Sequence, residues 1–273
     1  SDGGLLWSYL TGGGVAGAPT VAEGRVYVGS YDNKIYSLDA ASGTFLWSYL
    51  TRDVVISQPA VWEGTVYVGS WDGRLYALDA FDGDLKWQYA TGAVVDSSPA
   101  VADGIVYVGS YDGNVYALNA TSGVVPLDEF SSEVIWQFAT GDMVMLSGPA
   151  VNDGIVYVGS YDGNVYALNS KDGKLIWNYT TGFAVVSSPA ISDGIVYIGS
   201  EDFEVYALNT IDGSLVWKYM TDEQIHLSFP PLLHMEWSIS DHTTIMFMLW
   251  VHQHNFIFYF GSAQRHQLGW HNK

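Results

Sequence analysis

The histidines are the residues whose type and spacing most suggest metal chemistry. All 7 lie near the C-terminal end of the chain, and one residue separates His252 from His254. Side chains two residues apart lie on the same face of a strand, and imidazole is a common zinc ligand. A zinc site needs at least one further protein ligand, for which the tail offers His234, His242 and His266. We retain His252 and His254 as metal-ligand candidates and predict no dedicated metal site.

A second group of possible ligands is formed by aspartates in repeated turns. Asp-Gly pairs occur at three of these positions, and two related positions keep the aspartate without the glycine; the five residues are Asp32, Asp72, Asp112, Asp162 and Asp202. Each turn supplies one carboxylate, whereas Ca²⁺ takes about six to eight oxygen ligands. We therefore predict that these aspartates form turns.

Nothing in the sequence assembles a catalytic constellation. Asp96 is the one acid at a position where the related segments carry Ile56, Leu146 or Val186, and a single carboxylate is not a site. We find no phosphate-binding loop, dinucleotide fingerprint or Ser-His-Asp arrangement. The sequence thus predicts neither catalytic nor cofactor-binding residues, and a protein that is not an enzyme.

Charge and composition exclude several classes of partner. Lys+Arg number 10 and Asp+Glu 29, which gives a net charge of −19. Duplex nucleic acid and anionic bilayers both attract basic proteins, so neither is expected as a partner. The absence of Cys excludes disulfides and thiolate chemistry. No uncharged apolar run approaches the length of about 18 residues that predicts membrane insertion.

The elements that would position these residues follow from an internal repeat. The segment Gly104–Leu118 recurs unchanged at Gly154–Leu168, and with edits from Gly24, Gly64 and Gly194. Successive copies start 40, 40, 50 and 40 residues apart. A period near 40 residues is typical of propeller blades.

Each unit predicts four short strands separated by turn residues. In one unit, Pro99–Ala102, Ile105–Ser110 and Asn114–Asn119 are apolar segments separated by Asp-Gly pairs, and the fourth strand is exemplified by Leu175–Tyr179. Asp-Gly between apolar runs is a strong hairpin signal. Strands that are apolar on both faces suit a sheet packed between two neighbours.

The fourth strands carry a recurrent tryptophan preceded by a recurrent glycine, as in LDAFDGDLKWQY and LNSKDGKLIWNY. This pattern resembles the tryptophan-docking motif of the PQQ-like β-propeller repeat family, which includes quinoprotein dehydrogenases and BamB-like propellers. The resemblance covers roughly Gly3 to Ser228 and implies that these residues pack blade against blade. The matching positions are Trp7, Trp47, Trp87, Trp136, Trp177, Trp217, Gly43, Gly83, Gly123, Gly173 and Gly213. The catalytic residues of the dehydrogenases have no counterpart here, so no cofactor is expected.

We therefore predict an all-β fold, a single β-propeller domain over residues 1–273. Residues 19–228 form five regular four-stranded antiparallel blades. Residues 1–18 contribute a closing strand, Gly3–Leu10, which carries Trp7 without the three strands that should precede it. Residues 229–273 form an irregular sixth blade that this strand completes, since closure removes the exposed sheet edges.

The repeat vanishes after Ser228, and a reading-frame shift is our hypothesis for its loss. Back-translating His234–Trp250 and reading two nucleotides out of step permits G-V-V-Y-I-G-S-Y-D-x-N-V-Y-A-L, the blade consensus. The tail nevertheless stays rich in aromatic and branched residues. We expect strands at Trp237–Ile239, Thr243–Trp250 and Phe256–Phe260.

The function that these features predict is a non-catalytic binding or scaffolding propeller with a protein partner. Members of the resembled family suggest export to the cell surface or periplasm, and two Asn-x-Thr triplets, at Asn119 and Asn178, agree with export. One alternative is a degenerate PQQ- or metal-dependent oxidoreductase, and another is a decayed or engineered repeat protein without a selected function. The protein is expected to be a monomer, or a weak oligomer through its irregular last blade.

Overall fold

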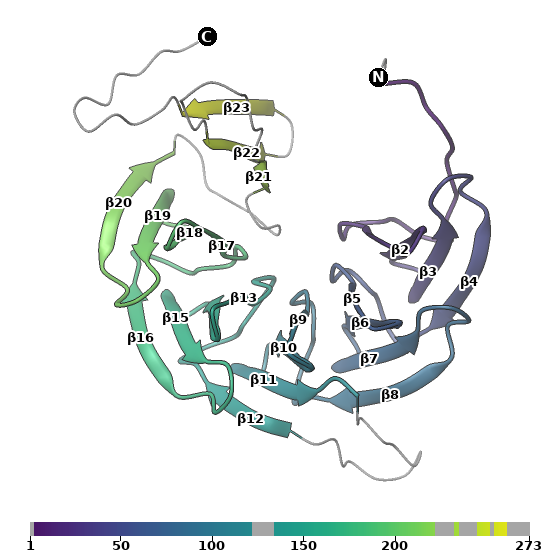
Figure 1. Ribbon diagram of the computed structural model, residues 1–273, viewed down its shortest axis with the longest axis horizontal. Coiled ribbons are helices and arrows are strands. Elements are labelled where there is room, and N and C mark those ends of the chain that lie inside the picture. Colours follow the sequence, from purple (N-terminus) through teal and green to yellow (C-terminus); the bar gives the residue numbers. More distant parts are fainter. Residues whose placement is uncertain (1–2, 122–133, 222–231, 235–244, 252–253, 261–273) are drawn as a thin grey trace.

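The structure, a computed structural model, contains five four-stranded antiparallel sheets arranged around a common axis (Figure 1). It describes residues 3–121, 134–221, 232–234, 245–251 and 254–260, the last three ranges as backbone only. Every described element is a strand, and the described residues contain no helix that could cross a membrane. The predicted all-β propeller fold with five regular blades is confirmed.

Each blade runs outward from the axis in chain order. The innermost strands are β1 (Thr20–Ala22), β5 (Ala60–Trp62), β9 (Ala100–Ala102), β13 (Ala150–Asn152) and β17 (Ala190–Ser192). The second strands are β2 (Arg25–Gly29), β6 (Thr65–Ser70), β10 (Ile105–Gly109), β14 (Ile155–Gly159) and β18 (Ile195–Gly199). The innermost strands have only three residues each, because the blades converge there.

The outer half of each blade has longer strands. The third strands are β3 (Lys34–Asp39), β7 (Arg74–Asp79), β11 (Asn114–Asn119), β15 (Asn164–Asn169) and β19 (Glu204–Asn209). The outermost strands are β4 (Phe45–Leu50), β8 (Leu85–Ala90), β12 (Val134–Ala139), β16 (Leu175–Thr180) and β20 (Leu215–Met220). The register between third and outer strands shifts once in every blade, as between Ala117 and Leu118. Such an irregularity increases the local twist.

The Asp-Gly pairs do not all form the same type of turn. At the first hairpin of each blade both central residues have positive φ, as at Asp103 (50°) and Gly104 (75°), which is the type I′ geometry. At the second hairpin Gly113 has a φ of 83°, but Asp112 is not among the residues with positive φ. The Ser110 N–H instead donates to Asn114 O over a longer turn. Asp-Gly thus forms a type I′ turn at the first hairpin and a different turn at the second.

The hydrophobic core lies between blades. One cluster joins Tyr67 and Leu75 of the second blade to Val106 and Leu118 of the third, and all four side chains are at most 1% exposed. Equivalent clusters lie at the other three junctions between regular blades. The second and third strands are buried on both faces because each blade is covered by its two neighbours.

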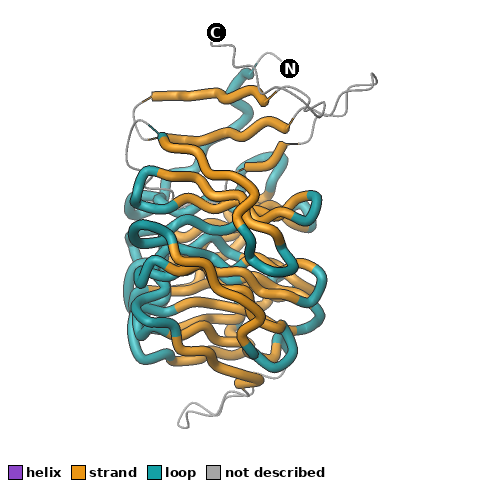
Figure 2. Tube along the Cα trace, turned by 90° about the vertical axis from the view of Figure 1, so that its left-hand side faces the viewer, coloured by secondary structure: helices purple, strands orange, loops and turns teal. Residues whose placement is uncertain are grey.

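The tail forms a three-stranded sheet beyond β20, with β21 (Leu232–His234), β22 (Ile245–Val251) and β23 (His254–Phe260) paired in that order. Figure 2 shows this sheet stacked at one end of the series of blades. Two of the three predicted tail strands overlap β22 and β23, whereas Trp237–Ile239 lies outside the described residues. The reading-frame hypothesis stays a prediction.

The predicted closure by Gly3–Leu10 is not seen in the described part of the chain. These residues belong to no strand, and β23 is paired with β22 only. The described blades form an open arc, with residues 3–10 and the tail sheet on opposite sides of the opening (Figure 1). Trp7 and Tyr9 of this N-terminal segment contact the first blade through their side chains.

Candidate functional site

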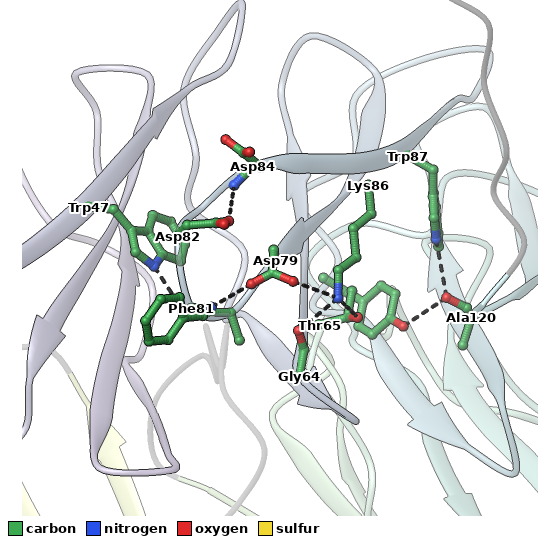
Figure 3. A network of polar contacts seen from close by, with 12 residues as sticks. Trp47, Gly64, Thr65, Asp79, Phe81, Asp82, Asp84, Lys86, Trp87 and Ala120 are labelled. Atoms are coloured by element: carbon green, nitrogen blue, oxygen red, sulfur yellow. Dashed lines mark hydrogen bonds and ion pairs between the residues drawn. The ribbon is translucent and has the colours of Figure 1, made fainter.

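Five of the six recurrent tryptophans hydrogen-bond to the following blade, four of them from an outer strand. Trp87 Nε1 on β8 donates to Ala120 O of the next blade at 3.1 Å, and the Tyr67 hydroxyl donates to the same carbonyl at 2.9 Å (Figure 3). The same bond is made by four other indoles: Trp7 to Ala40 O, Trp47 to Ala80 O, Trp136 to Ser170 O and Trp177 to Thr210 O, at 2.8–3.1 Å. The indole N–H is thus hydrogen-bonded at every one of these five junctions.

The recurrent glycines make room for those indole rings. Gly83 has a φ of 81°, and a Cβ placed on it would lie 2.6 Å from Cδ2 and Cε3 of Trp47. Gly43 contacts Trp7, Gly173 contacts Trp136 and Gly213 contacts Trp177 in the same manner. Gly123 lies outside the described residues. At these positions both the backbone conformation and the space require glycine.

Trp217 is the exception among the predicted docking residues. It lies on β20, the outer strand of the last regular blade, and is half-buried. Its ring packs 5.9 Å from that of Tyr197 in its own blade, but the described residues provide no carbonyl of a following blade. The structure therefore shows only the intrablade half of this junction.

The repeated aspartates form a second junction, at the other end of each outer strand. The Asp112 carboxylate accepts hydrogen bonds from the Gly92 N–H of the preceding blade at 2.7 Å, the Tyr116 hydroxyl at 2.7 Å and the Asn114 N–H at 3.0 Å. Asp32, Asp72, Asp162 and Asp202 make the corresponding contacts. Burial opposes ionisation of Asp32, but hydrogen bonds led by that of Tyr36 lower the pKa of the carboxyl. The turns are thus also links between blades.

Sequence reasoning missed this link, although its signal is present. In four of the five units a glycine precedes the turn aspartate by 20 or 21 residues, and a tyrosine follows it by four in all five. In the second blade the donor N–H belongs to Arg52, which shows that the link requires only a backbone group at this position.

The N-terminal residues repeat the contacts of an outer strand on the first blade. Trp7 donates to Ala40 O at 3.0 Å, the Gly12 N–H donates to Asp32 at 2.9 Å, and the Tyr9 ring packs 5.9 Å from Tyr36. Three leucines of this segment are highly exposed: Leu5 at 84%, Leu6 at 90% and Leu10 at 93%. Trp7, Tyr9 and Gly12 thus hold the segment against the first blade.

The antiparallel topology gives the blades two distinct ends. The clasp end consists of the second-hairpin turns, which hold the linking aspartates, and the loops that follow the outer strands. The opposite end consists of the first-hairpin turns and the turns between third and outer strands. There Lys86 forms an ion pair with Asp79 at 3.1 Å and also donates to Gly64 O (Figure 3). The Phe81 N–H and the Lys86 ammonium lower the pKa of Asp79, against the effect of burial.

One buried carboxylate at the clasp end breaks the repeat. Asp96 is 3% exposed; it accepts hydrogen bonds from the Tyr111 hydroxyl at 2.6 Å and from the Leu146 N–H at 3.0 Å. Burial raises the pKa of Asp96, although both hydrogen bonds oppose the shift. Leu146 has a φ of 61°, which the other blades do not repeat at this position. From the sequence Asp96 is a single carboxylate. In the structure its hydrogen bonds link the third and fourth blades.

The metal-ligand candidates lie outside the part of the chain with described side chains. His252 is not described, and His254 is described only as the first residue of β23. Among the residues with described side chains, no group of three or more histidines or carboxylates is placed to hold a metal ion. The tail histidines therefore stay untested.

This arrangement defines a β-propeller whose four-stranded blades are joined by tryptophan and aspartate links. A family model described as outer membrane protein assembly factor BamB matches residues 1–61, 53–126 and 122–246, and the chain belongs to this family. A search of curated proteins found no match.

Several solved structures share the fold. BamB from Moraxella catarrhalis is 21% identical with a TM-score of 0.69, and the match covers 93% of this chain and 76% of that one. The computationally designed Ika8 protein is 17% identical, with a TM-score of 0.68 and coverage of 84% and 67%. The quinohemoprotein alcohol dehydrogenase ADHIIG from Pseudomonas putida is 19% identical, with a TM-score of 0.66 over 94% and 53%. The chain spans about half of that dehydrogenase, and these likenesses show the fold alone.

Proposed function

We infer that the protein is a non-catalytic scaffold that binds another protein through the loops of its clasp end. The observation that carries this inference comes from comparing the residues at equivalent positions of the five blades. Residues shared by the blades lie in the junctions, where their polar groups bond to neighbouring blades. The loop tips of the clasp end are among the positions that differ from blade to blade; they hold Gly13, Asp53, Ala93, Asp142 and Phe183. Exposed, variable loops on a rigid scaffold are typical of binding proteins.

Family membership supports a role outside the cytoplasm. The matching family is described as an outer membrane assembly factor, which agrees with an exported protein that works by binding another protein. The net charge of −19 favours solubility and disfavours nucleic acid as a partner.

The alternative function is that of a quinone-dependent oxidoreductase, because the quinohemoprotein alcohol dehydrogenase shares this fold. Such an enzyme must bind its quinone and metal ion from solution. The scaffold function predicts that titration of the purified protein with pyrroloquinoline quinone and Ca²⁺ leaves the visible absorption spectrum equal to the sum of its components. A saturable spectral change with a stoichiometry near one would overturn the scaffold function.

A further inference from the structure

Aromatic residues recur at one position of the clasp end, in the turn that follows the second strand of each of the first four blades. The position holds Tyr31, Trp71, Tyr111 and Tyr161 in the first four blades. Tyr31 is 47% exposed and Trp71 is 38% exposed. Their backbone is fixed by the neighbouring loop, since the Trp71 N–H donates to Val54 O at 2.9 Å. The rings are therefore held at the end of the blades.

Exposed carboxylates lie in the loops next to two of these aromatic residues. Asp53 precedes Val54, the residue that bonds to Trp71, and Asp142 precedes Met143, whose carbonyl accepts the Tyr161 N–H at 2.8 Å. Asp53 and Asp142 are both exposed and form no ion pair within the described residues. Arg52 is the one cation in these two loops. Blades two and four thus each present an aromatic ring near an exposed carboxylate, and in blade two Arg52 lies next to that carboxylate in the sequence.

The third blade, between them, carries the residue that breaks the repeat. The hydroxyl of Tyr111 is held by the buried carboxylate of Asp96 at 2.6 Å, and Asp96 is held in turn by the Leu146 N–H. This bond fixes the Tyr111 ring and places a further carboxylate beneath the surface. Positive φ at a non-glycine residue such as Leu146 is a strained conformation that often accompanies function.

We propose that Trp71, Tyr111, Tyr161, Asp53 and Asp142 form an aromatic–acidic face that binds a basic, extended segment of the partner protein. The proposal rests on the proposed function and specifies the chemistry of the partner. Guanidinium and ammonium groups are attracted both to the faces of aromatic rings and to carboxylates. The charge of −19 adds a long-range attraction for a cationic segment.

A peptide titration tests this face. The probe is a fluorescein-labelled dodecapeptide of alternating arginine and glycine, and its matched control has glutamate in place of arginine. Binding is measured by fluorescence anisotropy at about 0.15 M salt, where exposed charges are screened beyond about 8 Å. We expect saturable binding of the arginine peptide and none of the glutamate peptide. Trp71→Ala, and the double variant Asp53→Asn with Asp142→Asn, should each weaken binding by about fivefold or more.

A matched control separates the face from net charge alone. Asp153→Asn with Asp193→Asn removes the same charge from the opposite end, at turn positions with φ of 49° and 51° that asparagine adopts readily. This control should bind the arginine peptide within about twofold of the parent, because its changes lie away from the face.

Three results would overturn the proposal: equal weakening by both double variants, equal binding of both peptides, or no binding of the arginine peptide by a parent that melts cooperatively. None of them bears on the scaffold function itself, which the quinone titration tests separately. Thermal melts of every variant establish that a loss of binding does not reflect unfolding.

Discussion

The indole ring of Trp47 lies against Gly83 of the next blade, so that a Cβ on this glycine would be 2.6 Å from two ring atoms. The Trp47 N–H also donates to Ala80 O at 3.1 Å. One residue of the outer strand therefore contacts both the backbone and the turn of its neighbour. This geometry explains why tryptophan and glycine recur together.

Gly83→Ala should destabilise the protein by roughly 2–5 kcal/mol, because it adds both left-handed backbone strain and overpacking against Trp47. Gly64→Ala is the matched control, since Gly64 has a φ of 68° and nothing within 4 Å of its would-be Cβ. Its loss should be about 1–2 kcal/mol, from backbone strain alone. Urea denaturation measures both, and equal losses would show that the Trp47 contact is unimportant.

Trp177→Ala should lower the free energy of unfolding by roughly 3–5 kcal/mol, because it removes a large aromatic side chain packed between two blades. Trp177 is 7% exposed and donates to Thr210 O. Trp217→Ala should cost less, since Trp217 is half-buried. A loss below about 1 kcal/mol for Trp177→Ala in denaturant melts would contradict its docking role.

Asp112→Asn should destabilise the protein by about 1.5–3 kcal/mol, because the carboxylate accepts four hydrogen bonds, one of them from the preceding blade. Asp103→Asn serves as the comparison, since Asp103 occupies a first-hairpin turn with a φ of 50°. That change should be nearly neutral, as asparagine accepts this conformation. Thermal melts at neutral pH decide between a linking role for Asp112 and a role in its own turn only.

The raised pKa of Asp96 predicts a pH dependence with a definite sign. Because burial raises the pKa above that of the unfolded chain, the folded state binds the proton more tightly. The contribution of Asp96 is fully present below the unfolded pKa and is lost as the pH rises through the folded pKa. The stability of the parent relative to Asp96→Asn should therefore fall as the pH rises above about 4, the ordinary pKa of an aspartate. Denaturant melts across this range measure the difference, and a flat or rising difference would contradict the assignment.

The five blades could be predicted from the sequence because each repeat contains short-range signals for its strands and turns. Apolar runs and Asp-Gly pairs set the strands, and the spacing of Trp87 from Gly83 marks the junctions. The bond from Gly92 to Asp112 could not be derived with the same certainty, since it joins residues 20 apart through a backbone group. The environment of Asp96 depends on Leu146, 50 residues away, and only the folded structure brings them together.

The closing strand was the least predictable part of the fold. Trp7 and Gly12 both hydrogen-bond to the first blade, and of the two only Trp7 was singled out from the sequence. Whether a backbone ladder forms depends on the partner strand, and the tail no longer carries the repeat that would specify its register.

Hydrogen exchange of the indole N–H groups is the most direct test of the central claim, which is that the tryptophans join the blades and the loops bind the ligand. The indole N–H groups of Trp47, Trp87, Trp136 and Trp177 are buried and hydrogen-bonded between blades. In ¹H–¹⁵N spectra they should exchange slowly, near the rate of global unfolding, whereas the indole N–H of the 38% exposed Trp71 should exchange rapidly. Exchange of the four junction indoles as fast as that of Trp71 would contradict the account.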